Sequence, residues 1–336
     1  MKLLVVGGGS IGARHLRNLR ALGAGELALA EPDAERRAEL AVETGARAFG
    51  ALSEGLAWAP DVVLVATPPH LHVEQAAAAV DAGAHVFVEK PLSHTEEGLD
   101  ALTERVAGRG VVSLVGCNMR FHPGPATVRR LLDEGRIGRV LFARVHTGSW
   151  LPGWRAGTDY RRSYSASAAQ GGGCLLDCIH EIDLARWYLG DVVSVSCEAA
   201  SRGSLELDVE DVAMLVLTHA DGALSQVHLD YVQRSYERGC QVVGEHGTIF
   251  WDFRAGAVRL YEAAADRWTT LPQPEAWTVN DMYVDELRHF LDCVRDGGAA
   301  ALPVAEAAEV TRIALAARRS ARTGARVELG RAACAA

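Results

Sequence analysis

The stretch KLLVVGGGSIGARHL (residues 2–16) decides the fold of this chain. A short apolar strand runs directly into Gly7, Gly9 and Gly12, which are spaced as G-x-G-x-x-G and open a helical pattern over residues 11–22. A strand, a glycine-rich turn and a helix in this order are typical of the first unit of a dinucleotide-binding fold. The spacing alone is a weak signal in a chain with 34 glycines, so the prediction depends on its placement.

Each glycine of this turn has a separate task in such a fold. Gly7 permits the tight turn, Gly9 lets the backbone approach a pyrophosphate, and Gly12 lets the helix lie close to the strand. Ser10 and Ile11 begin the helix, whose first N–H groups point at the anion. We therefore expect all five residues to bind the cofactor.

Glu31 ends the next predicted strand, close to the usual offset of about 20 residues for the acid that accepts from the adenosine ribose hydroxyls. Its carboxylate would repel a 2′-phosphate, so we expect NAD rather than NADP. Arg36 and Arg37 are the evidence against this preference, because a nearby arginine can accommodate that phosphate. We interpret both arginines as exposed helix surface.

The first 118 residues alternate apolar runs with amphipathic stretches. This alternation predicts an N-terminal Rossmann domain (residues 1–118) with a doubly wound parallel sheet and helices on both faces. The expected strands cover residues 2–6, 26–30, 62–67, 85–89 and 111–116, and the expected helices cover residues 11–22, 33–44, 71–82 and 95–107.

After residue 118 the pattern changes to period-2 segments separated by turns such as Asp221-Gly222. It predicts a C-terminal α+β domain (residues 119–336) with an open, mostly antiparallel sheet, one face on helices and the other exposed or paired with another subunit. The expected strands are one starting at 139 and those over 209–219, 223–232, 240–244, 248–253 and 257–262, and the expected helices cover 125–134, 174–188, 282–295 and 304–322.

Composition excludes several classes of protein. The chain has 34 basic and 43 acidic residues and a net charge of −9, without a long basic block, so we expect no nucleic-acid or membrane partner. Its apolar runs are shorter than the roughly 20 residues that span a bilayer, and no signal-peptide core follows Met1, so we expect a cytoplasmic location. The seven cysteines fit no disulfide framework, and Cys174 and Cys178 lack a second ligand pair, so we expect no metal.

Three further motifs narrow the assignment: ATPPHLH (66–72) and EKP (89–91) end two predicted strands, and GGG (171–173) precedes Asp177, His180 and Asp183. Together with the glycine-rich turn they resemble the Gfo/Idh/MocA family of glucose–fructose oxidoreductases and inositol dehydrogenases. The resemblance covers nearly the whole chain. It implies an NAD(P)-dependent oxidoreductase that moves a hydride between nicotinamide and a secondary alcohol or ketone of a sugar, inositol or NDP-sugar-like substrate. It also implies a homodimer or homotetramer formed through the C-terminal sheet.

Lys90 matches the family's catalytic lysine, and Pro91 matches the lysine's partner. The position of Lys90 agrees with that role, because a residue at the carboxyl end of a parallel strand faces the crevice where such sheets bind ligands. There an ammonium group can bind the substrate hydroxyl and stabilise the developing oxyanion. The alternative is an ordinary surface lysine, but the chain contains only Lys2 and Lys90, and this scarcity favours the functional interpretation.

Asp177 and His180 match the family's acid–histidine pair, although they stand three residues apart where relatives commonly have four. Residues three apart share a face of a helix, so both side chains could point into one cleft and contact substrate. A histidine, with a reference pKa near 6.5, suits removal of the hydroxyl proton, and Asp177 would orient it. Which of the two is the base stays open, Glu181 is a minor candidate, and a packed histidine beside a helix-terminal acid is the non-catalytic alternative.

The remaining candidates follow from position. We expect the cofactor to contact residues at the ends of the two motif-bearing strands, namely Thr67, Pro68, His72, Glu89 and Lys90, although His72 could equally be a helix-start residue. For the substrate we expect Asn118 and Arg120, where the chain leaves the Rossmann domain. The loop over 150–172 is too long for a simple connection, and it adds Tyr160 and Arg162, since aromatic rings suit sugars and arginines suit anions.

Two other functions fit the same fold. One is a redox-neutral glycosidase that uses bound NAD transiently. The other is a non-catalytic regulatory protein that senses a sugar or a dinucleotide, against which the intact Lys90, Asp177 and His180 argue.

Overall fold

The computed structural model describes residues 1–154 and 157–330. The chain divides into two compact units, Met1–Asn118 with Thr278–Ala308, and Met119–Trp277 with Glu309–Ala336. Sequence patterning predicted a division after Asn118 with everything later in one domain. The structure instead groups Thr278–Ala308 with the first unit, because this late segment packs on the N-terminal fold.

The first unit is built on a parallel six-stranded sheet in the order β3-β2-β1-β4-β5-β6. In such a sheet ligands bind beyond the carboxyl ends of the strands, where the order reverses between β1 and β4. The strands are β1 (Lys2–Val6), β2 (Glu26–Ala30), β3 (Arg47–Phe49), β4 (Val62–Val65), β5 (His85–Val88) and β6 (Ser113–Val115). Most of their side chains are buried, as expected where helices cover both faces.

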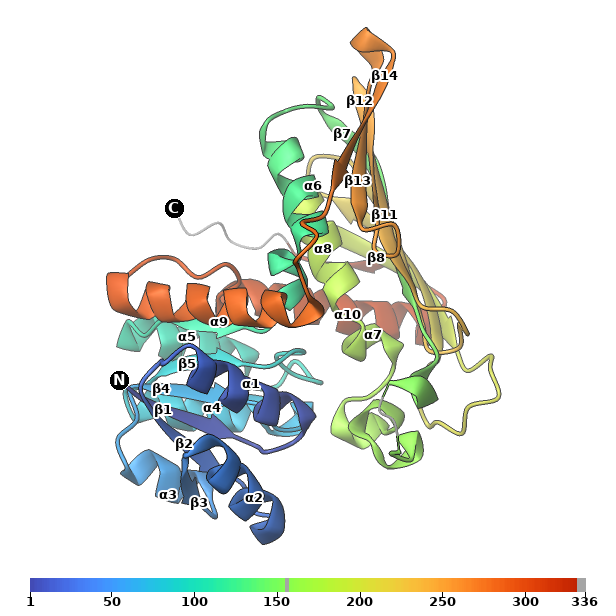
Figure 1. Cartoon of the computed structure of the whole chain (residues 1–336). Helices are drawn as coiled ribbons and strands as arrows, with labels where there is room; N and C mark the ends of the chain where they lie inside the picture. The colour runs from blue at the N-terminus through green and yellow to red at the C-terminus, as the bar shows by residue number, and fades with distance from the viewer. Residues whose placement is uncertain (155–156, 331–336) are drawn as a thin grey trace. The chain divides into compact units, whose positions relative to one another are not determined.

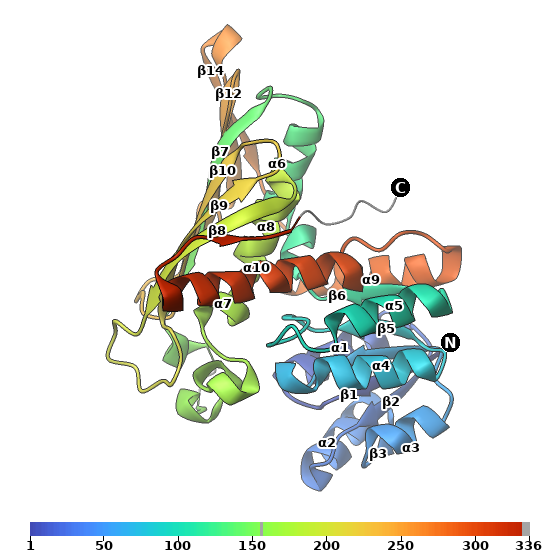
Figure 2. The ribbon, with the colours of Figure 1, turned by 180° about the vertical axis from the view of Figure 1, so that it is seen from behind.

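Helices cover both faces of this sheet, with α1 and α9 on one side and α4 and α5 on the other (Figures 1 and 2). The helix α9 comes late in the chain, and its Leu287 and Phe290 join a core that contains Leu16 and Phe87. The helices of this unit are α1 (Ser10–Ala21), α2 (Ala34–Thr44), α3 (Leu52–Ala57), α4 (His72–Asp81), α5 (Leu99–Arg109) and α9 (Val279–Asp296).

The second unit contains a nine-stranded sheet in the order β14-β13-β12-β11-β7-β10-β9-β8-β15. Among the described strands of this sheet, only β7 and β10 pair in parallel, so the sheet is mostly antiparallel as predicted. The strands are β7 (Val140–Gly148), β8 (Val192–Ala200), β9 (Val212–His219), β10 (Leu224–Asp230), β11 (Glu237–Gly244), β12 (Gly247–Asp252), β13 (Ala257–Glu262), β14 (Arg267–Pro272) and β15 (Val327–Glu328).

One face of this sheet packs against α6 (Pro123–Asp133) and α8 (His180–Leu189), as Figure 1 shows nearly edge-on. Burial alternates along the strands, so that Ala213 and Leu215 are buried whereas Met214 and Val216 are about half exposed. The second face therefore presents apolar side chains. The remaining helices are α7 (Cys174–Asp177) and α10 (Val304–Thr323), which begins in the first unit and ends in the second.

The prediction of one continuous helix over residues 174–188 is wrong. The helix is interrupted after Asp177, because Cys178 leaves the helical conformation with φ −94° and ψ 34°, and a second helix begins at His180. Within the described parts of the chain, no helix combines the length and the apolar character needed to cross a bilayer.

Candidate active site

The glycine-rich turn between β1 and α1 has the shape of a phosphate cradle. Gly7 has φ +94°, a left-handed conformation that favours glycine, and a Cβ at Gly12 would lie 1.9 Å from the carbonyl oxygen of Gly7. A Cβ at Gly9, by contrast, would meet no atom within 4 Å, so open space borders this residue. Because Gly9 is also the N-cap of the 12-residue α1, the first N–H groups of the helix begin beside that space.

Glu31 lies immediately after β2 and reaches back to this turn. It is 5% exposed, and its Oε2 accepts a 2.6 Å hydrogen bond from the N–H of Gly8, while Oε1 accepts one of 2.9 Å from Asp33. The Arg37 guanidinium donates to the backbone carbonyl of Glu31 at 2.6 Å, and a guanidinium nitrogen of the half-exposed Arg36 is 3.8 Å from Oε1. The acid and the glycine turn thus form one structure, whose donor set and open space fit a dinucleotide.

The residues after β4 and β5 are held by buried polar contacts. Glu89 is 7% exposed, and its Oε1 lies 2.6 Å from Nε2 of His15 on α1. The other carboxylate oxygen accepts from the backbone N–H of Lys90 at 3.2 Å, which fixes the backbone where the lysine side chain begins. The following Lys90–Pro91 peptide bond is cis. At the end of β4, the hydroxyl of Thr67 donates to the side chain of Gln75 at 2.7 Å.

Asp177 is the centre of a buried hydroxyl cluster in the second unit. Tyr164 and Ser165 donate to its two carboxylate oxygens at 2.7 and 2.6 Å, and Tyr231 donates at 3.2 Å. Burial raises the pKa of Tyr231 well above its usual value, so this phenol remains a donor at ordinary pH. Three hydroxyl donors stabilise the ionised carboxylate and join the loop before α7 to the end of β10.

His180 is the first residue of α8 and is 8% exposed. Because the helix is broken at Cys178, His180 and Asp177 do not lie on one face of a continuous helix, which corrects the prediction made from their spacing. Glu181, the minor candidate for the base, is fully buried and accepts from the Arg238 guanidinium at 2.6 and 3.1 Å. This ion pair makes Glu181 a structural anchor beside His180.

Arg120, expected to contact substrate, forms a buried ion pair. Its guanidinium donates to both carboxylate oxygens of Asp183 at 2.9 and 2.6 Å and lies over the Trp187 ring at 5.1 Å. Asn118, the last residue before the second unit, is 5% exposed. Arg162 is exposed in a short 3-10 helix, η4 (Tyr160–Arg162).

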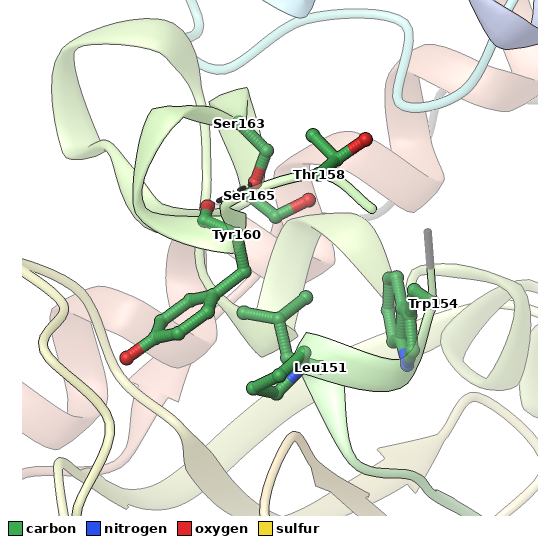
Figure 3. Close-up of a pocket in the computed structure, with 7 residues that line it drawn as sticks. Leu151, Trp154, Thr158, Tyr160, Ser163 and Ser165 are labelled. Carbon is green, nitrogen blue, oxygen red and sulfur yellow. Dashed lines mark hydrogen bonds between the residues drawn. The ribbon is translucent and has the colours of Figure 1, made fainter. Parts of the chain in front are cut away.

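A pocket of the second unit adjoins the Asp177 cluster (Figure 3). Ser165 belongs to both the pocket and the cluster, and Trp154 packs edge-on against Tyr231 with ring centroids 5.3 Å apart. The labelled residues of its wall are Leu151, Trp154, Thr158, Tyr160, Ser163 and Ser165. The hydroxyl of Tyr160 accepts from the N–H of Glu206 at 3.2 Å. The structure thus brings part of the long loop next to Asp177, whereas residues 155–156 lie outside the described chain.

Sequence reasoning missed Ser165 and Tyr231 as partners of Asp177. Three strands, β8, β9 and β10, lie between Asp177 and Tyr231 in the sequence, so no local pattern connects the two residues. Tyr283 lies over the Arg14 guanidinium at 4.5 Å and edge-on to His15, and burial raises its pKa. Within residues 1–154 and 157–330, no cluster of three or more histidine, cysteine or acidic side chains could hold a metal ion.

Comparison with known proteins relates both units to one family. Residues 1–117 match the family model described as an oxidoreductase family with an NAD-binding Rossmann fold, and residues 126–250 match the GFO/IDH/MocA C-terminal domain. The scyllo-inositol 2-dehydrogenase (NAD(+)) of Bacillus subtilis is 27% identical over 340 residues, which cover 98% of this chain and 96% of that protein. Inositol 2-dehydrogenase 3 of Saccharopolyspora erythraea is 32% identical over 303 residues, which cover 88% and 85%.

Solved structures give the same relationship. Levoglucosan dehydrogenase in complex with NADH has a TM-score of 0.91 at 25% identity, and the match covers 99% of this chain and 100% of that one. GenD2 from gentamicin A biosynthesis, in complex with NAD, has a TM-score of 0.84 at 29% identity, with 98% and 96% covered.

Proposed function

The chain belongs to the GFO/IDH/MocA family and is an NAD-dependent oxidoreductase of CH–OH groups in sugar-like substrates, and we propose that Lys90 and His180 carry its proton chemistry. NAD, when bound, supplies the nicotinamide carbon that accepts or returns the hydride. The residues proposed to hold it are those of the glycine turn and of the ends of β2, β4 and β5, namely Gly7, Gly9, Ser10, Ile11, Gly12, Glu31, Thr67, Pro68, Glu89 and Lys90.

The Lys90 ammonium group donates to the substrate oxygen and stabilises the negative charge that grows there during oxidation. His180 receives the hydroxyl proton, so that the alcohol loses one proton to the protein and one hydride to the cofactor. The observation that supports His180 as the base is the hydroxyl cluster, because the Asp177 oxygens already accept from Tyr164, Ser165 and Tyr231. Asp177 then acts by holding the substrate loop in place.

The substrate is proposed to be a neutral polyol, such as an inositol or an anhydrosugar. Two arginines of the expected substrate region are engaged by carboxylates, Arg120 with Asp183 and Arg161 with Asp159 and Glu206, and this leaves the exposed Arg162 as the remaining candidate cation of the described part of the loop. A sugar nucleotide would need positive charge that these contacts use. The relatives named for inositol and levoglucosan support the same choice.

Residues 1–118, with which Thr278–Ala308 form one unit, are proposed to bind the dinucleotide, and the rest of residues 119–336 to form the substrate and subunit-contact domain. Assembly into a homodimer or homotetramer would cover the half-exposed Met214 and Val216 on the outer face of the large sheet. A cytoplasmic location is part of this proposal, since a reducing compartment suits a chain without a disulfide among its described cysteines.

The experiment that tests the proposed substrate class is a screen for NADH formation from NAD. We expect turnover with myo-inositol, scyllo-inositol or levoglucosan and little with UDP-linked sugars. Preference for a UDP-linked sugar would contradict the neutral-polyol proposal. Release of a leaving group without net NADH would instead indicate the redox-neutral glycosidase.

A further inference from the structure

His72 lies between two backbone carbonyl groups at the carboxyl edge of the first unit's sheet. It is the first residue of α4 and is fully buried. Its Nδ1 is 2.8 Å from the carbonyl oxygen of Pro91, and its Nε2 is 2.7 Å from that of Thr67. Thr67 lies shortly after β4, and Pro91 lies three residues after the end of β5. One imidazole ring therefore connects the ends of two neighbouring strands.

Each of the two contacts requires an N–H on the ring to be a hydrogen bond, because a carbonyl oxygen can only accept. A neutral ring has one N–H and donates to one of the two oxygens, whereas an imidazolium donates to both. Burial lowers the pKa of His72, and the two carbonyls together with Glu89 oppose that shift. In either state the ring has no exposed surface with which to touch a ligand.

The partners of His72 are adjacent to the residues that carry the chemistry. Pro91 is bonded directly to Lys90, whose backbone N–H is held from the other side by Glu89. Thr67 belongs to the group proposed to contact the cofactor. A movement of either carbonyl would displace the corresponding side chain, and a misplacement of about 1 Å can cost about 100-fold in rate.

We propose that His72 is a positioning residue that sets Thr67 and Lys90 relative to each other through these two carbonyls, and that it makes no cofactor contact of its own. This inference rests on the proposed function, in which Lys90 is catalytic. It changes the role expected for His72 from the sequence. Its two nitrogens face separate carbonyls, Nδ1 that of Pro91 beside the lysine and Nε2 that of Thr67, and the imidazolium is the form that donates to both.

Two substitutions separate the two contacts. The amide nitrogen of asparagine occupies nearly the place of a histidine Nδ1, and that of glutamine nearly the place of Nε2. H72N therefore keeps the Pro91 contact and loses the Thr67 contact, so we expect the Kd for NADH to rise about 5-fold with kcat within about 3-fold of wild type. H72Q keeps the Thr67 contact and loses the Pro91 contact, so we expect kcat to fall about 10- to 100-fold with the Kd for NADH nearly unchanged.

His219 provides a matched control in the second unit. It is also buried and also bridges two groups, the carbonyl of Gly190 and the hydroxyl of Ser225, both at 2.9 Å. H219Q should lower thermal stability without a split between kcat and Kd. If H72N and H72Q change kcat and Kd in the same proportion, as H219Q does, or if both behave as wild type, the inference is wrong.

A second measurement needs no substrate. Reductive ¹³C-methylation labels the two lysines of the chain together with the N-terminal amine, and Lys2 serves as the internal reference. We expect the Lys90 methyl signal to shift on addition of NADH in the wild type and in H72N, and to lose that shift in H72Q. The same shift in all three proteins would contradict the inference. K90M tests the proposed function separately, because its turnover does not depend on what His72 does.

Discussion

The backbone N–H of Gly8 donates a 2.6 Å hydrogen bond to Oε2 of Glu31. This contact joins the glycine turn after β1 to the acid at the end of β2. A hydrogen bond within the protein that holds two site residues together lowers the ordering cost of binding.

The first prediction concerns this acid. Substitution E31Q removes the charge that we propose accepts from the ribose hydroxyls, and hydrogen bonds to charged groups contribute about 1.5–3 kcal/mol. We expect the Kd for NADH to rise about 10- to 100-fold and the discrimination against NADPH to shrink, as measured by fluorescence titration. E35Q, an exposed position in the first turn of α2, is the control. Unchanged affinity in E31Q would exclude Glu31 from the site.

The second prediction separates His180 from Asp177. H180Q should lower kcat by about 100-fold or more and remove the acidic limb of the pH–rate profile, because that limb reports protonation of the base. D177N should keep the limb and lower the free energy of unfolding by about 1–3 kcal/mol, since its partners are hydroxyl donors. If D177N loses the acidic limb of the pH–rate profile and H180Q keeps it, Asp177 rather than His180 is the base.

The third prediction concerns stability at low pH. His122 is fully buried beside Trp251 and Trp277, its Nδ1 accepts from the N–H of Gly124, and burial lowers its pKa to about 4. The unfolded chain, with a pKa near 6.5, therefore binds a proton that the folded chain refuses. The contribution of His122 to the free energy of unfolding is fully present above about pH 6.5. It is lost as the pH falls toward about 4, and the loss is on the order of 3 kcal/mol.

Substitution H122N tests this claim, because an asparagine oxygen can accept from Gly124 but does not titrate. The free energies of unfolding of the wild type and H122N can be compared by urea unfolding at a series of pH values. Between about pH 6.5 and 4 we expect the difference to change in favour of H122N. A difference that stays constant over that range would show that His122 does not titrate as described.

The fourth prediction concerns assembly. Val216 is 48% exposed on the outer face of the large sheet, and a charge there would oppose burial against a second copy. We expect V216E to reduce the mass of the assembly measured by light scattering, whereas V42E, at an 87% exposed position on α2, should leave it unchanged. A monomeric wild-type protein would contradict the proposal at once.

Local sequence order was sufficient to predict the dinucleotide half of the molecule. Gly7, Gly9, Gly12 and Glu31 lie within one strand–turn–helix–strand unit, so their arrangement depends on short-range geometry. The strands β3, β8, β14 and β15 were not predicted. β3, β14 and β15 lie at sheet edges and are short or largely exposed, whereas β8 was missed although burial alternates over its residues 195–198.

Contacts between distant segments could not be predicted. The helix ends at Asp177 although neither proline nor glycine follows at Cys178. This break places Asp177 and His180 in separate helices. Tyr231 contacts Asp177 across a sequence separation of 54 residues, which no local pattern encodes. The packing of α9 on α1 likewise depends on tertiary structure, and it assigns residues 278–308 to the first unit.

The central claim is that Lys90 is the catalytic lysine, and steady-state turnover of K90M on the best polyol of the screen tests it most directly. K2M is the matched control, since Lys2 is the other lysine of the chain and contacts Trp58 on the first unit. We predict that K90M loses kcat by about 100-fold or more while its Kd for NADH stays within about 5-fold of wild type, and that K2M retains turnover. Turnover of K90M close to that of the wild type would contradict the account.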